Sequence, residues 1–204
     1  HTTPVEVIAS GVTRIALNSL NACAVVSGDL YCWGYNATGH VGIGTSTTRE
    51  TTPQLVLSGG VTEVTMGGSH TCALQGGAVK CWGYNNKGQV GIAATTTYQT
   101  TPHTVISSGA TDLGESAGRG NQSCAIVASQ LYCWGIESNE LVGTFAPTLI
   151  ATEGTPEFVA QSDDGLCYHN TVGVTYCRGF DKNGSVGTTK GQTRFTLGLW
   201  DVSL

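Results

Sequence analysis

The chain has 204 residues, of which 11% are charged and 29 are glycine, and its formal net charge at pH 7 is -5. An acidic chain with so few charges lacks the basic stripe that a phosphate-binding surface needs, which argues against a nucleic-acid partner. No apolar run approaches the roughly 20 residues that cross a bilayer, so we expect no membrane span. Abundant Gly, Thr and Ser with little Glu, Lys or Arg favour short strands and turns over long surface helices.

One phrase recurs four times along the chain, each time around a pair of cysteines. The first cysteines of successive pairs lie 49, 52 and 43 residues apart. A period of about 40 to 50 residues with strand-like content is typical of propellers and solenoids, in which each repeat is one supersecondary unit. We therefore predict an all-β fold of four propeller-type blades, each with about four antiparallel strands and one disulfide-stapled hairpin. The predicted repeats cover roughly residues 11–58, 59–108, 109–155 and 156–204.

The predicted strands follow the same order in each repeat. Residues 1–10 match the closing strand of a blade, so we expect the chain to begin in mid-blade. An alternating strand such as residues 12–15 opens each repeat, and the two strands of the disulfide hairpin follow. A polar turn and a Thr-rich loop then lead to a strand that contains proline, as at residues 52–56. The third repeat has an insertion around residues 117–120, and the fourth is the most degenerate.

The spacing of the cysteines selects one pairing. If Cys72 and Cys81 lie directly opposite each other on antiparallel strands, the turn centres on Gly76-Gly77, which is a favourable two-residue hairpin loop. The same rule places Ser27-Gly28 in the first turn and Ala128-Ser129, a poorer turn, in the third. In the fourth hairpin Gly173 stands where a three-residue loop needs a left-handed residue.

Residues that face each other in a non-hydrogen-bonded pair come close enough for a disulfide. Structural zinc prefers ligand pairs two residues apart, so the longer spacing here favours disulfides over metal. Such bridges persist only outside a reducing cytosol, and we therefore predict an extracellular protein, secreted or at the cell surface, whose signal peptide has already been removed. The predicted bridges are Cys23–Cys32, Cys72–Cys81, Cys124–Cys133 and Cys167–Cys177.

The phrase from Gly68 to Leu74, continued from Val79 to Gly91, resembles the repeat of the regulator of chromosome condensation family. The resemblance is strong in the first two repeats, fair in the third and weak in the fourth. It implies a β-propeller of four-stranded blades, and the cysteine pairs make the chain similar to secreted bacterial members. Nuclear members act on chromatin and a small GTPase, a function that does not carry over to an acidic, short chain with predicted disulfides.

Four repeats fall short of the roughly seven blades with which rings of this family usually close. An arc of blades leaves unpaired edge strands, which invite pairing with another chain. A tight four-bladed ring, a larger ring shared by two chains and open head-to-tail stacking all remain open. Our leading hypothesis is a non-enzymatic extracellular scaffold that self-associates through blade edges, as a filament or surface-layer subunit. The alternative is a secreted binding module for a protein ligand, as in an inhibitor, or for a glycan.

Several side chains are candidates for specific roles. Three tryptophans occupy one position of the hairpin, which favours packing between blades over a sugar-stacking ladder. The inter-blade set is Trp33, Trp82 and Trp134. Three asparagines fit the N-glycosylation pattern, namely Asn36, Asn121 and Asn183.

No catalytic site, metal or cofactor is predicted. His1 together with a second histidine would suit a copper site, but nothing in the sequence selects that second ligand. Residues 181–184 resemble the start of a calcium loop and lack its later Glu, so they are interpreted as a turn. No phosphate-binding loop motif occurs, and a catalytic cysteine is not expected if all eight are bridged.

Overall fold

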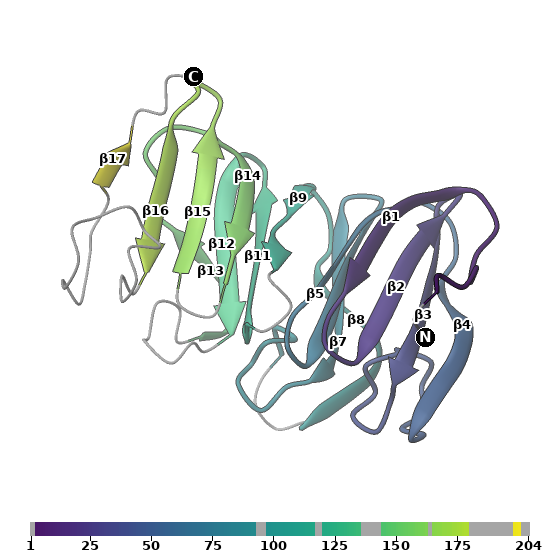
Figure 1. Cartoon of the computed structure of the whole chain (residues 1–204). Coiled ribbons are helices and arrows are strands. Elements are labelled where there is room, and N and C mark those ends of the chain that lie inside the picture. Colours follow the sequence, from purple (N-terminus) through teal and green to yellow (C-terminus); the bar gives the residue numbers. More distant parts are fainter. Residues whose placement is uncertain are drawn as a thin grey trace.

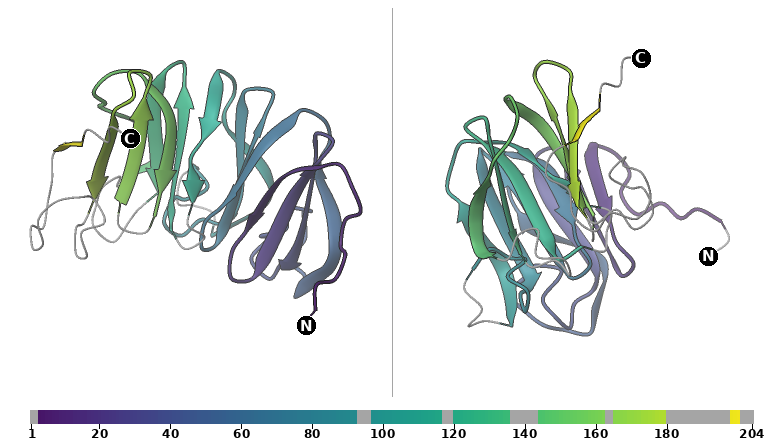
Figure 2. Two further views of the ribbon diagram at one scale, coloured as in Figure 1. Left: turned by 45° about the horizontal axis from the view of Figure 1, so that its top comes forward. Right: turned by 90° about the vertical axis from the view of Figure 1, so that its left-hand side faces the viewer.

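The computed structural model of the chain describes residues 3–92, 97–116, 120–135, 144–162, 165–179 and 198–200. These residues form four sheets that lie side by side in an arc, with the first and the fourth at opposite ends (Figure 1, Figure 2). The prediction of an all-β, propeller-type fold is confirmed. The described residues contain no helix, and hence no helix long and apolar enough to cross a membrane.

The first two sheets, called blade 1 and blade 2, have the predicted meander of four antiparallel strands in chain order. The strands of blade 1 are β1 (Val12–Leu17), β2 (Asn21–Val26), β3 (Asp29–Tyr35) and β4 (Arg49–Leu57). Those of blade 2 are β5 (Val61–Met66), β6 (His70–Gln75), β7 (Ala78–Tyr84) and β8 (Tyr98–Ile106).

Blades 3 and 4 depart from this pattern at one point. After Gly114, the two-residue strand β10 (Glu115–Ser116) leaves blade 3 and pairs in parallel with the first strand of blade 4, which therefore has five strands rather than four. Blade 3 consists of β9 (Ala110–Leu113), β11 (Gln122–Val127), β12 (Gln130–Gly135) and β13 (Thr144–Ile150). The remaining strands of blade 4 are β14 (Pro156–Gln161), β15 (Gly165–Asn170), β16 (Thr175–Gly179) and β17 (Gly198–Trp200).

The expected closing strand at the N-terminus is not formed. Residues 3–10 lie outside every sheet and are largely exposed. Each of the four sheets already holds a fourth strand from its own stretch of the chain, so none of them lacks the strand that this segment was expected to supply.

The disulfide hairpins have the predicted register. In every blade the two cysteines lie directly opposite each other, with Cα atoms 4.0 to 4.1 Å apart, close to the spacing of a non-hydrogen-bonded pair. All eight cysteines lie in the described residues and none is free. The four predicted bridges are therefore confirmed.

The hydrophobic core lies between the blades. Because successive side chains of a strand point to opposite faces, each blade has a disulfide face, which carries its cystine, and an opposite tryptophan face, which carries Trp33, Trp82 or Trp134 in blades 1 to 3. Each of the three core clusters joins the disulfide face of one blade to the opposite face of the next. The inner strands β6 and β11, covered on both sides, are consequently buried along nearly their whole length.

The hairpin turns of blades 1 to 3 have two central residues each, and the sequence analysis expected the Ala128-Ser129 turn of blade 3 to be unfavourable. All three have positive φ at both central positions, and in blade 3 these are Ala128 at +48° and Ser129 at +63°. Glycine adopts this conformation at little cost, whereas a residue with a Cβ pays about 1–2 kcal/mol. The disulfide register thus imposes the turn on residues that do not favour it.

We expect Ser129→Gly to raise the free energy of unfolding by about 1 kcal/mol, because it relieves the left-handed strain at an exposed site. Denaturant unfolding under non-reducing conditions measures the change. The reverse substitution at the equivalent position, Gly28→Ser, serves as the control and should lower stability by a similar amount. Equal stability of Ser129→Gly and the native chain would contradict the explanation.

Candidate interaction surface

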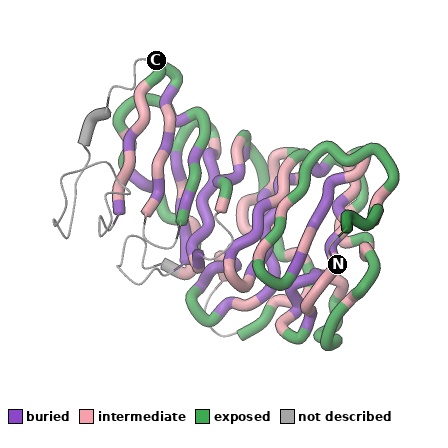
Figure 3. Tube along the Cα trace, viewed as in Figure 1, coloured by how far each residue is buried: buried purple, intermediate pink, exposed green. Residues whose placement is uncertain are grey.

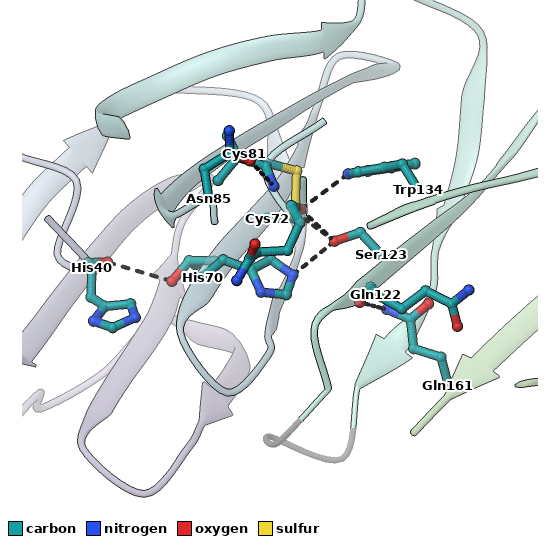
Figure 4. Close-up of a disulfide and its surroundings, with 12 residues drawn as sticks. His40, His70, Cys72, Cys81, Asn85, Gln122, Ser123, Trp134 and Gln161 are labelled. Atoms are coloured by element: carbon teal, nitrogen blue, oxygen red, sulfur yellow. Dashed lines mark hydrogen bonds between the residues drawn. A yellow bond between two sulfur atoms is a disulfide. The ribbon is translucent and has the colours of Figure 1, made fainter. Parts of the chain in front are cut away.

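The interface between two neighbouring blades is called a joint here. The joint between blades 1 and 2 is centred on Trp82, and that between blades 2 and 3 on Trp134. The Trp82 Nε1–H donates a hydrogen bond to the carbonyl of His40 at 2.9 Å, and the Trp134 Nε1–H donates one to the carbonyl of Gln89 at 3.1 Å. Both indoles are fully buried. Figure 4 shows Trp134 and Ser123 approaching the Cys72–Cys81 disulfide from the neighbouring blade. The prediction of inter-blade packing therefore holds for these two tryptophans.

The carbonyl that accepts the indole belongs to a Gly-x-Val-Gly loop, found as Gly39–Gly42 in blade 1 and Gly88–Gly91 in blade 2. A Cβ placed on Gly42 would lie 2.6 Å from the Trp82 Nε1 atom, and its φ is +87°, so only glycine fits against the ring. The sequence analysis did not assign this role to the loop. Its repetition at the same distance after Trp33-Gly34 and after Trp82-Gly83 is the signal that would have found it.

A buried asparagine shapes this loop from inside. The Asn36 Oδ1 accepts the Val41 N–H, and its amide nitrogen donates to Thr45 and Thr47. Asn85 repeats the contact by accepting the Val90 N–H. Since Asn36 is fully buried and these hydrogen bonds occupy its amide, the folded blade has no space for the glycan expected there.

The other two glycosylation candidates lie elsewhere. Asn121 is partly buried, and its Oδ1 accepts a hydrogen bond from Gln89 Nε2 at 3.2 Å. Asn183 lies outside the described residues. N-glycosylation of Asn121 and Asn183 stays a prediction.

A buried histidine and serine meet in the joint between blades 2 and 3. His70 Nε2 lies 2.7 Å from the Ser123 Oγ, which is itself 3.0 Å from the Gln89 carbonyl. Because the carbonyl can only accept, the single Ser123 proton goes to it, and His70 must be the donor to Ser123. This polarity is opposite to that of a histidine activating a serine nucleophile.

Burial lowers the pKa of His70 to about 3, with a smaller contribution from His40, so the ring is neutral. Burial also lowers the pKa of His40, whose Nδ1 lies 2.7 Å from the Thr38 Oγ1. Both histidines are parts of joints, and neither is exposed to solvent. In the described residues no three His, Cys, Asp or Glu side chains are grouped so that they could hold a metal ion.

Carboxylates form a second contact between blades. The Glu63 Oε2 accepts the N–H of Leu113 in blade 3 at 2.8 Å, and the Asp112 Oδ2 accepts the N–H of Val159 in blade 4 at 3.1 Å. Burial raises the pKa of Glu63, and it raises that of Asp112 to about 6, with further increases from Glu63 and Glu115. The acid in Val-Thr-Glu-Val and Ala-Thr-Asp-Leu was the sequence signal for this contact, which the sequence analysis missed.

The tryptophan face of blade 1 is the one such face that the described residues leave uncovered. It carries Ile15, 70% exposed, although the equivalent residues Leu113 and Val159 are 3% and 2% exposed. Strand β1, at one end of the arc, is exposed along most of its length (Figure 1, Figure 3).

The same contrast in exposure between blade 1 and the inner blades holds two residues further along β1, at Leu17. Leu17 is 67% exposed, and Met66, its equivalent in blade 2, is 1% exposed. Trp33 is only partly buried, and no blade of the described residues packs against its face, so the predicted inter-blade packing is not seen for this tryptophan. We call Val12, Ile15, Leu17 and Trp33 the open face of blade 1, and it is the candidate interaction surface.

Replacing Trp82 tests the importance of the indole contact. We expect Trp82→Phe to lower the free energy of unfolding by at least about 2 kcal/mol, because it leaves a cavity and removes the donor to the His40 carbonyl. Denaturant unfolding measures this loss. Trp33→Phe, at the equivalent position on a face that the described residues leave uncovered, is the matched control and should cost less than about 1 kcal/mol. Similar losses in both variants would contradict the proposed role.

The raised pKa of Asp112 predicts how stability depends on pH. The folded chain binds this proton near pH 6, whereas the carboxyl has an ordinary pKa of 3.8, so the proton stabilises the folded state. The melting temperature should therefore rise as the pH is lowered from about 7 to about 5. Asp112→Asn, which keeps an acceptor for the Val159 N–H, should show a smaller rise. An equal rise in both proteins would show that Asp112 is not the responsible group.

Comparison with known proteins identifies the repeat. Two family models, both described as the regulator of chromosome condensation (RCC1) repeat, match residues 27–74 and 61–89. No curated protein matches the sequence.

Solved structures share the fold at low sequence identity. Human WBSCR16 has a TM-score of 0.76 at 17% identity, over 92% of this chain and 52% of its own. Yeast RCC1 (Prp20) in its complex with Kap60 has a TM-score of 0.73 at 17% identity, over 90% and 47%. Prp20p of Saccharomyces cerevisiae, described with its binding properties to Gsp1p and histones, has a TM-score of 0.73 at 16% identity, over 92% and 50%. The chain spans about half the length of these structures.

These matches agree with the four sheets and with the resemblance stated from the sequence. Identities this low establish the fold and leave the partners of the relatives as properties of those proteins. Residues 27–89 of the chain match the regulator of chromosome condensation repeat, and its four disulfide-stapled sheets have the β-propeller fold of these solved structures.

Proposed function

We propose that this chain is a non-enzymatic extracellular scaffold that self-associates through the blades at the ends of its arc. The fold itself suggests a protein-binding module. The observation that carries the more specific proposal is the open face of blade 1, which has the apolar residues of an inter-blade joint without a blade against it.

The open face of blade 1 exposes apolar side chains to water. Residues at the corresponding positions of the other blades lie in the core clusters, namely Val61, Met66 and Trp82 of blade 2, Ala110, Leu113 and Trp134 of blade 3 and Val159 of blade 4. Removing apolar surface from water is the main favourable term in association, and a cluster of exposed aliphatic side chains on one face marks an interaction site. The aliphatic members of the open face lie together on the outward side of β1.

The extracellular part of the proposal is supported by the disulfides. Four bridges occur in a chain whose cysteines are all paired, and such bridges form and persist in oxidising environments. The non-enzymatic part is supported by His40 and His70, whose rings are buried in joints, and by the polarity of the His70–Ser123 contact.

The relatives favour a protein as the partner. Yeast RCC1 was crystallised with Kap60, and Prp20p is described by its binding to Gsp1p and histones. These partners are not transferred to this chain. They do show that propellers of this repeat type bind proteins, which is the class of ligand that self-association requires.

The mass of the native, non-reduced chain in solution tests the proposal. We expect species larger than a monomer that grow with concentration in sedimentation velocity, and ordered assemblies in electron microscopy. Leu17→Asp should shift the distribution to monomer, because it places a charge on the open face. Leu149→Asp, a half-exposed leucine of blade 3 away from that face, is the matched control and should assemble like the native chain.

A monomer at all concentrations would contradict self-association. The alternative, a secreted module that binds a different protein or a glycan, would then be favoured. Assembly that Leu17→Asp leaves intact would show that another surface is responsible.

A further inference from the structure

We infer that the open face of blade 1 binds the disulfide face of blade 4 in a second copy of this chain, so that copies join head to tail. This inference rests on the proposed self-association and adds which two surfaces meet. The internal joints supply the template, since each places the disulfide face of one blade against the opposite face of the next.

The disulfide face of blade 4 is open in the part of the chain that the structure describes. The cystines of blades 1 to 3 are buried by the following blade, whereas Cys167 and Cys177 are only partly buried. On the same face Phe158 is 52% exposed and stacks on His169, with ring centroids 4.9 Å apart. Within the described residues two faces are thus uncovered, and they are of the two kinds that meet in every internal joint.

Phe158 indicates which residue it would contact. It occupies the strand position of Glu63 in blade 2 and Asp112 in blade 3. Those carboxylates reach Leu113 and Val159, the residues of the next blade at the position of Ile15. The template therefore places Phe158 of one copy against Ile15 of the next.

The chemistry of this pair fits a joint between copies. In blades 2 and 3 the position carries a half-buried acid that accepts a backbone N–H, and in blade 1 it carries Arg14. At the end of the arc it carries an aromatic ring, and Ile15 and Leu17 are aliphatic side chains exposed on the opposing face. An apolar pair gains free energy when two separate surfaces come together and leaves no buried charge to compensate.

A head-to-tail joint is heterologous, because two different faces of the same chain meet. It is distinguished from a symmetric joint, in which blade 1 of one copy meets blade 1 of another, by blocking one face at a time. Two single variants achieve this: Ile15→Asp blocks the open face of blade 1, and Phe158→Asp blocks the disulfide face of blade 4.

Both substitutions are at exposed positions, so the variants should fold with all four disulfides formed. Val172→Asp, in the exposed turn of blade 4, controls for the added charge. Mass spectrometry without reduction and the melting temperature verify folding, and sedimentation velocity gives the mass of each sample.

We expect each variant alone to associate at least about tenfold more weakly than the native chain, and Val172→Asp to behave like it. In an equimolar mixture the intact blade 4 face of Ile15→Asp meets the intact blade 1 face of Phe158→Asp. The mixture should therefore form a species of twice the monomer mass and nothing larger.

Other results overturn the inference. If Phe158→Asp assembles like the native chain while Ile15→Asp does not, the joint is symmetric, and only the head-to-tail arrangement fails. Two monomeric variants whose mixture also stays monomeric contradict it as well. A native chain that is monomeric at every concentration removes the proposed self-association and this inference together.

Discussion

The structure depends on one contact, the indole N–H of a tryptophan donating to a backbone carbonyl of the preceding blade. The ring is fully buried and lies against a glycine whose conformation and lack of a side chain are both required. This contact sets the distance between sheets and covers the disulfide of the preceding blade. A blade without a neighbour keeps its hairpin but loses most of its core, as expected for repeat proteins whose units bury their faces only against one another.

The disulfides stabilise the individual hairpins, and the joints stabilise the packing of one blade on the next. A bridge across a loop of about ten residues stabilises its hairpin by roughly 2–3 kcal/mol in the chain-entropy model. The hairpins then present a flat apolar surface in a fixed register, which is strong enough to hold Ala128 and Ser129 in a left-handed turn. The joints add the apolar burial that a chain with few charged residues needs, and the half-buried carboxylates of Glu63 and Asp112 hold the blades in register at their first strands.

The first and fourth blades each have one face that no other blade of the described residues covers, and the proposed function rests on these faces. At the first blade, aliphatic residues that are buried elsewhere face the solvent, and at the fourth blade an exposed phenylalanine stands where the inner blades have an acid. Surfaces of the same two kinds already bind each other three times inside the chain. A binding function therefore needs no separate site, because the blade that organises the fold also supplies its interaction surface.

The sequence by itself determined the repeat, the strand order, the turns and the four disulfides, because hairpin register is a local property that follows from the spacing of cysteines and turn residues. It also identified Trp82 and Trp134 as packing residues. Only the tertiary structure decided which atoms these indoles contact, that Asn36 is buried, that Trp33 lies on an open face and that β10 crosses to blade 4. It also showed that residues 3–10 form no strand. Each of these depends on which blade lies next to which, and a contact between segments about 40 to 50 residues apart is fixed by the packing of whole sheets rather than by local pattern.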